Sequence, residues 1–277
     1  MSSGQNQDLI LFKDNSLVSE QILNSKASLL SLITHVQGTS PAWLTNSLIE
    51  NALCGTAALV NNDLTKKVDN RAEVILISFL HSKDHYIKNC RKNGLDLATN
   101  PSFTFVDCFT KLFTETIKTP EKASSEVANL FGNIISTISK IENSRKVVFV
   151  EAPEILLQAT SVSSDELLAL LLKINRLSRQ LFVISSRDYN TVFNLDSSVS
   201  QDPVFKCTDF LVKLHHRSQY NISLQPLSTG RANDITGSLA VSTGAIPVDS
   251  LIPNLYVNEK EYIFNITKDS NVRLFLR

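Results

Sequence analysis

The residues that most suggest chemistry lie in the stretch THVQGTSPAWLTN, which runs from Thr34 to Asn46 after an apolar segment. An apolar strand, a short loop with a glycine and an apolar helix form the frame of a phosphate-binding loop. In such a loop, glycines let backbone N–H groups surround the phosphates, a lysine neutralises charge, and a serine or threonine binds magnesium. This stretch is therefore the first place to look for nucleotide chemistry.

The groups that the chemistry needs are missing from this loop. When the helix starts are superposed, the Gly-Lys-Thr positions fall on Ser40, Pro41 and Ala42, and the first glycine position falls on His35. Independently of that register, none of the eight glycines in the chain is followed by lysine. Ser40 and Pro41 suit the N-cap and the first helical position, because proline lacks a donor that the first turn would leave unpaired. The sequence thus predicts a degenerate phosphate loop that starts a helix, and no cofactor.

A second nucleotide-like feature is the run KVVFVE, in which apolar residues precede Glu151. This is the layout of a Walker B strand, whose acidic end holds magnesium or polarises water. The signal is weak by itself, since buried strands often end in an acid where they meet solvent. Without a lysine in the loop, Glu151 has no metal–phosphate complex to complete.

The other candidate ligands are isolated side chains. His81 and His85 have the i, i+4 spacing that places two imidazoles on one helix face, but no third ligand is indicated, so no metal site is predicted. Arg187, directly after an apolar strand, and Arg231, in a turn, are placed to meet RNA, a phosphate or a neighbouring chain. An ordinary solvated arginine remains the alternative at both positions.

Composition indicates a globular, intracellular chain. Hydrophobic residues make up 43% of the 277 residues, and Lys+Arg and Asp+Glu both total 27, so no net field attracts nucleic acid. The four cysteines form no CxxC pair and are interpreted as reduced thiols. No apolar stretch approaches membrane-spanning length, and no basic, apolar leader opens the sequence.

Apolar runs and amphipathic patterns alternate through the first two thirds of the chain, which predicts a mostly parallel sheet flanked by helices. One helix is expected after Pro120, and another after Ser163, which forms a capping box with Glu166. The second helix is apolar around much of its girth, so it should be buried on two sides. The expected strands are Leu29–Thr34, Ala72–Leu80, Phe103–Cys108, Lys146–Ala152 and Gln180–Ser186.

The last third has a different character. From about residue 204 to 277, short β-rich segments alternate with turn residues, which predicts an antiparallel extension of the same sheet. The polar segment from Ser185 to Pro203 is the expected long exposed loop. No composition break supports a second domain, so residues 1–277 are expected to form one domain, with about residues 1–7 flexible.

The opening QDLILF, the segment VEAPEILL, the run PLSTGRANDITGSLAVSTG and the ending RLFLR resemble the Elongator complex protein 6 family of yeasts. The resemblance spans about Gln7 to Arg277 and is densest between Pro226 and Gly244. It implies a RecA-like, P-loop NTPase-type α/β fold without a complete phosphate-binding loop of its own.

The resemblance also implies partners. That family works with Elongator proteins 4 and 5 in a heterohexameric ring, which joins the catalytic Elongator subunits that modify carbon 5 of the wobble uridine in tRNA. The chain is then expected in the cytoplasm and nucleus as a non-catalytic subunit that supports tRNA binding. Two alternatives stay open: a contribution in trans to an ATPase site shared between ring protomers, through Glu151 or an arginine, and a pure assembly adaptor without RNA contact.

Overall fold

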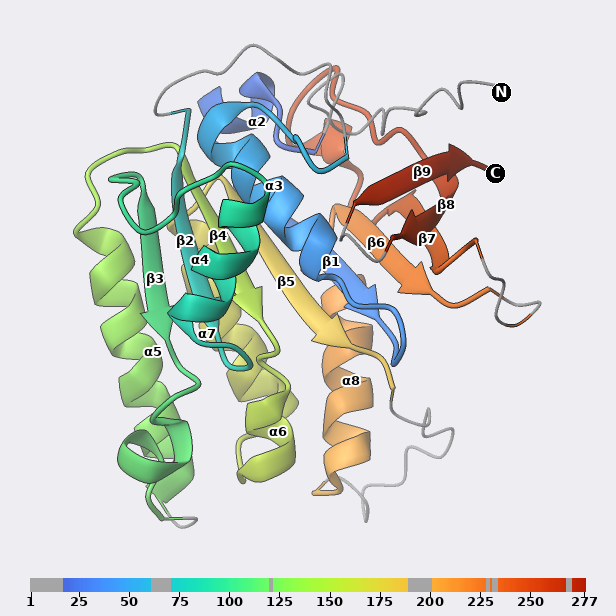
Figure 1. The fold of residues 1–277 in the computed structure, drawn as a ribbon. Coiled ribbons are helices and arrows are strands. Elements are labelled where there is room, and N and C mark those ends of the chain that lie inside the picture. The colour runs from blue at the N-terminus through green and yellow to red at the C-terminus, as the bar shows by residue number, and fades with distance from the viewer. Residues whose placement is uncertain are drawn as a thin grey trace, which may run out of the picture.

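The computed structural model describes residues 17–60, 71–119, 122–188, 201–227, 230, 234–267 and 271–277. Within these ranges, the chain folds around a nine-stranded sheet with helices on both faces (Figure 1). The strands lie in the order β3-β2-β4-β5-β1-β6-β7-β8-β9. Their bounds are β1 Leu29–His35, β2 Glu73–Ser78, β3 Phe103–Asp107, β4 Lys146–Glu151, β5 Gln180–Ser186, β6 Tyr220–Gln225, β7 Gly237–Thr243, β8 Lys260–Ile266 and β9 Val272–Leu276.

The sheet has a parallel part and an antiparallel part. Strand β1 pairs in parallel with both β5 and β6, and β4 joins β5 to β2 in the same direction. Strands β7, β8 and β9 continue the sheet as an antiparallel meander. Because β1 to β6 are parallel, their carboxyl ends meet at one edge, the lower edge in Figure 1.

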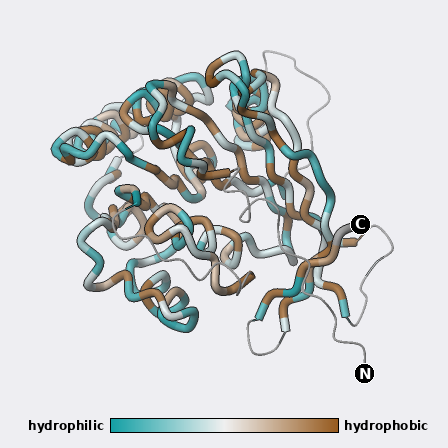
Figure 2. Tube along the Cα trace, turned by 90° about the horizontal axis from the view of Figure 1, so that it is seen from above, coloured by the Kyte–Doolittle hydropathy of each residue, from teal (hydrophilic) through white to brown (hydrophobic). Residues whose placement is uncertain are grey.

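Helices cover the two faces in separate layers. The helices α2, α3 and α4 bury their apolar side chains against one face of the sheet, and α5, α6, α7 and α8 pack against the other. In Figure 2, hydrophobic segments follow the strands between these layers. The bounds are α2 Glu20–Asn24, α3 Ala42–Cys54, α4 Lys83–Lys92, a π-helical turn η1 Leu112–Thr116, α5 Ala123–Ser139, α6 Ile155–Ala159, α7 Ser164–Arg176, α8 Pro203–His215 and a 3-10 turn η4 Val248–Ser250.

Two helix predictions can be compared directly with the fold. Helix α5 follows Pro120 and buries Val127, Phe131, Ile134 and Ile138 along one face. The capping box of Ser163 and Glu166 starts α7. The apolar side chains of α7 pack against the sheet and against the neighbouring helices α5 and α8.

Helix α3 is enclosed on all sides, since each residue from Trp43 to Cys54 is buried. Its buried polar groups are therefore held by specific partners. Glu50 accepts hydrogen bonds from the Thr56 hydroxyl (2.6 Å) and the Ala58 backbone N–H, and the Arg71 guanidinium donates to the Asn51 carbonyl (2.8 Å). This network fixes the helix whose first turn borders the candidate site.

The start of the C-terminal third differs from the prediction of a β-rich, antiparallel segment. Residues Pro203–His215 form helix α8, whose N-cap Asp202 accepts from the Val204 N–H at 2.7 Å. Strand β6 then pairs in parallel with β1, so the antiparallel part begins only at β7. The physical reason is that Asp-Pro is a strong helix start and that α8 buries Cys207 and Phe210 under the sheet.

Among the described residues, every helix is too short or too polar to serve as a membrane span.

Candidate functional site

A cavity of about 370 Å³ lies at the carboxyl ends of β1 and β4. Ligands of open α/β sheets bind at this edge, outside the ends of the parallel strands. The loop between β1 and α3 forms one wall of the cavity, and the segments after β2, β4 and β5 form the others. The side chains that matter for its chemistry belong to His35, Ser40, His81, Glu151 and Asp188.

The backbone N–H groups of the loop are largely used within the protein. Val36 and Thr39 bond to each other, through the Val36 N–H to the Thr39 hydroxyl (3.3 Å) and the Thr39 N–H to the Val36 carbonyl (3.0 Å). The Gln37 N–H donates to the Asp188 carboxylate at 2.5 Å. A carboxylate of the chain itself therefore takes a donor that a phosphate-binding loop would offer to phosphate.

The start of α3 has the local geometry that Ser40 and Pro41 suggest. The Ser40 hydroxyl accepts from the Ala42 N–H at 3.3 Å, and the Pro41 carbonyl accepts the first intrahelical bond from the Thr45 N–H at 2.9 Å. Helix α3 begins at Ala42, one residue later than predicted, although Pro41 already has helical dihedral angles (φ −79°, ψ −3°).

Glu151 is 7% exposed and is held by two side chains, one from the last residue of β2 and one from the segment that follows it. The Ser78 hydroxyl donates to its carboxylate, and His81 Nδ1 lies 3.1 and 3.2 Å from its two oxygens. Burial acts to raise the pKa of Glu151, but the hydrogen bonds from His81 and Ser78 outweigh it, so the pKa lies below the ordinary value. Glu151 is thus a charged group that ties β4 to β2.

The two histidines do not share a helix face, because α4 begins at Lys83 and His81 precedes it. Instead, the two imidazoles stack with ring centroids 3.9 Å apart. The pKa of His85 is lowered by burial and then by His81, which favours its neutral form. Across the described ranges, no cluster of three or more His, Cys, Asp or Glu residues has an arrangement that could hold a metal ion.

The electrostatics of the cavity oppose a polyphosphate. Among the described residues that line it, Glu151 and Asp188 are acidic, and none is lysine or arginine. Burial lowers the pKa of His35, and the carboxylates of Asp188 and Glu151 only partly offset this, so His35 is largely neutral at pH 7. Phosphate charges entering here would meet two carboxylates without a fixed cation to offset them.

Sequence reasoning missed a second buried acid beside this cavity. After β4, Ala152 adopts a positive φ of 54°, and the turn places Glu154 inside the fold at 3% exposure. Its Oε1 accepts from the Ser186 N–H at 2.7 Å, while Oε2 has no hydrogen-bond partner among the described residues. Burial raises the pKa of Glu154 to about 7. A left-handed alanine beside two buried acids is a strained turn that no sequence pattern signals.

The predicted arginines lie apart from this cluster. Arg187 follows β5 and is exposed, and its N–H donates to the His35 carbonyl at 2.8 Å. Its charge is the second cause, after burial, of the lowered pKa of His215 at the end of α8, so the guanidinium is close to that helix. Arg231 lies outside the described residues, as does most of the expected loop from Ser185 to Pro203.

Comparisons with known proteins place this geometry in context. No protein-family model matches the chain. Elongator complex protein 6 of Saccharomyces cerevisiae is 29% identical over 284 aligned positions, which cover 100% of both chains. The chain is similar to Elongator complex protein 6 along its whole length.

A solved structure similar to this chain is that of the flagellar accessory protein FlaH from Methanocaldococcus jannaschii. The TM-score is 0.56, the identity is 13%, and the match covers 96% of this chain and 95% of FlaH. Together with the parallel sheet, its flanking helices and the antiparallel C-terminal strands, the match confirms the predicted RecA-like fold.

Proposed function

We propose that the chain is a non-catalytic structural subunit of Elongator. The observation that carries the proposal is the cavity at the carboxyl ends of β1 and β4. Its described lining holds Glu151 and Asp188 with no lysine or arginine, and the loop N–H of Gln37 is already bonded to Asp188. A RecA-like frame with this lining suits protein assembly better than nucleotide hydrolysis.

In this proposal, the chain joins Elongator proteins 4 and 5 in a heterohexameric ring. The ring works with the catalytic Elongator subunits, binds tRNA and supports modification of carbon 5 of the wobble uridine. Full-length similarity to Elongator complex protein 6 supports these partners, and so does the resemblance of the segment from Pro226 to Gly244. The balanced charge of the chain, with 27 basic and 27 acidic residues, fits RNA binding that is shared with other subunits.

The first test measures assembly of the ring and then its ATP turnover. The chain is co-expressed with Elongator proteins 4 and 5, and the mass of the purified complex is measured. A ring with two copies of each chain is expected, with tRNA affinity that falls steeply as salt rises, because phosphate contacts release counterions. ATP turnover of the intact ring should be unchanged by Glu151→Gln. Failure to assemble, or turnover abolished by Glu151→Gln in an intact ring, would contradict the proposal.

A second candidate function is a contribution in trans to an ATPase site on a neighbouring protomer. Arg187 favours it, because it is exposed and lies at the same sheet edge as the cavity but outside it. Arginines from one ring protomer stabilise the transferring phosphate of the next. In an intact ring, Arg187→Ala should then lower ATP turnover at least about tenfold, while Arg217→Ala serves as a control from the nearby end of α8. Unchanged turnover excludes Arg187, and Arg231→Ala needs its own measurement.

A further inference from the structure

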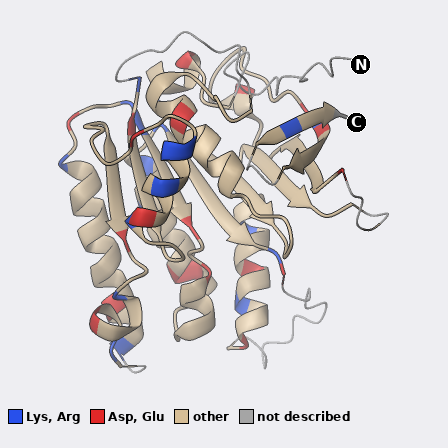
Figure 3. Ribbon diagram, in the orientation of Figure 1, with Lys and Arg blue, Asp and Glu red and all other residues tan. Residues whose placement is uncertain are grey.

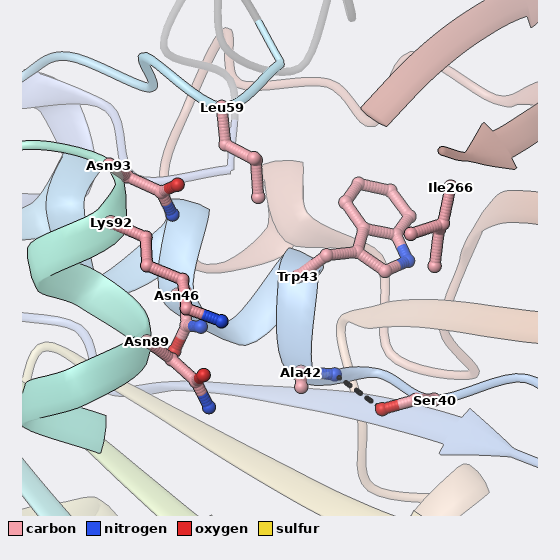
Figure 4. A pocket seen from close by; sticks show the side chains of 9 residues that line it. All are labelled: Ser40, Ala42, Trp43, Asn46, Leu59, Asn89, Lys92, Asn93 and Ile266. Atoms are coloured by element: carbon pink, nitrogen blue, oxygen red, sulfur yellow. Dashed lines mark hydrogen bonds between the residues drawn. The ribbon is translucent and has the colours of Figure 1, made fainter. Parts of the chain in front are cut away.

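A second cavity, of about 240 Å³, lies between α3 and α4 (Figure 4). It borders the first turn of α3 at Ser40 and Ala42 but opens on the helical layer rather than at the strand ends. Leu59 and Ile266 supply apolar walls, and five further lining residues carry polar side-chain groups. These are Trp43 and Asn46 from α3, and Asn89, Lys92 and Asn93 from the end of α4.

Two buried polar atoms of this cavity lack partners. Trp43 is 5% exposed and Asn46 is 7% exposed, and neither the indole N–H of Trp43 nor Oδ1 of Asn46 has a hydrogen-bond partner among the described residues. Buried indole N–H groups usually find an acceptor, and an unsatisfied buried group lowers stability. In Figure 4 the indole nitrogen of Trp43 lies beside Ile266, whereas Asn46 faces α4, so the open acceptor on the α4 side of the pocket is Oδ1 of Asn46. An unsatisfied acceptor at this place indicates an occupant that brings a hydrogen-bond donor.

The α4 side of the pocket adds amides and a cation. Asn89 Nδ2 lies 3.0 Å from His85 Nε2. In Figure 4, Lys92 of α4 and Asn46 of α3 extend toward each other from the two facing helices. Amide side chains around a small apolar slot can form hydrogen bonds with the edge of a planar heterocycle. Such an edge carries hydrogen-bond acceptors beside exocyclic donors.

The surface beside the pocket is basic. Helix α4 carries Lys83, Lys88, Arg91 and Lys92, and Asp84 is its one acid (Figure 3). Arg91 pairs with Asp96 at 3.2 Å, whereas the three lysines have no ion pair among the described residues. Although the chain as a whole is neutral, this helix therefore presents unpaired positive charge, which attracts a phosphate-bearing occupant.

We propose that this pocket binds one nucleotide unit, with the edge of an unpaired base against Asn46 and Asn89 and its phosphate near Lys92 and Lys88. The proposal rests on the RNA-binding part of the proposed function. The cavity is smaller than the roughly 300–1,000 Å³ of pockets that enclose drug-sized ligands, which fits a single base. The same chemistry is supplied by a free nucleotide or by an unpaired residue of RNA.

The chain contains a built-in reporter for this pocket, because Trp43 is its single tryptophan. The purified full-length chain is titrated with uridine and adenosine 5′-monophosphates, with a mixed-sequence single-stranded RNA, and with an acidic peptide. A saturable change in tryptophan emission is expected with nucleotide or RNA. A response to the monophosphates identifies the free nucleotide as a sufficient ligand, whereas a response to RNA alone identifies RNA.

Variants assign the response to the pocket. Asn46→Leu should weaken binding about tenfold, the effect of one lost hydrogen bond, and Lys92→Glu should weaken it several-fold while reducing the salt dependence. Lys140→Glu, an equal charge change at the exposed end of α5 on the other face, should leave binding unchanged. A thermal melt verifies that each variant is folded. If Asn46→Leu does not fold, the surface variant Lys92→Glu still tests whether the pocket binds nucleotide.

Three results would overturn the inference: constant tryptophan emission with every nucleotide and RNA, equal loss of affinity in Lys140→Glu and Lys92→Glu, or saturable binding of the acidic peptide alone. The last result would assign the pocket to a protein partner. Co-purification with Elongator proteins 4 and 5 is measured for the same variants. If one of the three results is obtained while the chain assembles and the ring binds tRNA, the pocket inference fails and the proposed function stands, whereas a wild-type chain that does not assemble contradicts the proposed function.

Discussion

Replacing Glu154 by glutamine should change how the stability of the protein depends on pH. Glu154 is buried, and only Oε1 has a partner, the Ser186 N–H at 2.7 Å. Burial raises the pKa of Glu154 from 4.5 to about 7 in the folded state. Glutamine keeps the acceptor for Ser186 and resembles the protonated acid in shape, but it cannot ionise.

The sign and size of the effect follow from proton binding. Between pH 4.5 and 7, the folded state keeps the proton of Glu154 while the unfolded state releases it. The free energy of unfolding contributed by this group is therefore full below about pH 4.5 and falls as pH rises through 7. At about 1.4 kcal/mol for each pKa unit, the loss above pH 7 amounts to about 3 kcal/mol.

The assay is urea unfolding of the wild type and Glu154→Gln at pH 5 and pH 8, with exposed Glu142→Gln as the matched control. Glu154→Gln should have nearly wild-type stability at pH 5 and exceed it by about 3 kcal/mol at pH 8. The control should differ little from wild type at both values. A stability difference between Glu154→Gln and wild type that does not grow with pH would refute the reasoning.

Four further substitutions are tested by urea unfolding, two at residues that line the cavities and two at glycines elsewhere in the fold. Glu151→Ala removes the acceptor that ties β2 to β4 and should lower the free energy of unfolding by about 2–4 kcal/mol; a change below about 0.5 kcal/mol would show that the tie is not stabilising. Asn46→Leu removes the unsatisfied buried Oδ1 and should raise stability by about 1 kcal/mol, so a clear loss would indicate that the side chain has a stabilising partner. Gly244→Ala should lower it by at least about 2 kcal/mol, because the new Cβ would lie 1.9 Å from the Ser218 carbonyl oxygen. Gly132→Ala in α5, where nothing lies within 4 Å, should instead stabilise by about 0.5–1 kcal/mol, and similar behaviour of the two variants would contradict the assigned crowding.

Much of the fold follows from local patterns. Strand β5 has the predicted bounds, and β1, β2, β3 and β4 differ from prediction by at most two residues at an end, because continuous apolar runs mark strands that are covered on both faces. The helix α8 was missed because its mixed polar and apolar residues were grouped with the β-rich segments that follow. The parallel pairing of β6 could not be deduced either, since pairing partners are set by the whole sheet rather than by the strand itself.

The site was predictable only in part. His35, Ser40 and Glu151 were singled out from the strand–loop–helix frame, and they line one cavity. Asp188, Ser78 and Glu154 were not, because their roles arise from contacts between distant segments, such as the bond from Gln37 to Asp188, 151 residues away. The pocket between α3 and α4 was equally hidden, since Trp43 and Asn46 belong to a helix that looked merely apolar.

The central claim is that this RecA-like chain does not bind nucleotide at the carboxyl ends of its strands. Isothermal titration of the purified chain with MgATP tests it most directly, with Elongator proteins 4 and 5 absent and Glu151→Gln measured in parallel. The account predicts the same titration for both proteins, because any nucleotide binding in the pocket between α3 and α4 does not involve Glu151. Saturable binding by the wild type that is lost in a folded Glu151→Gln variant would contradict it.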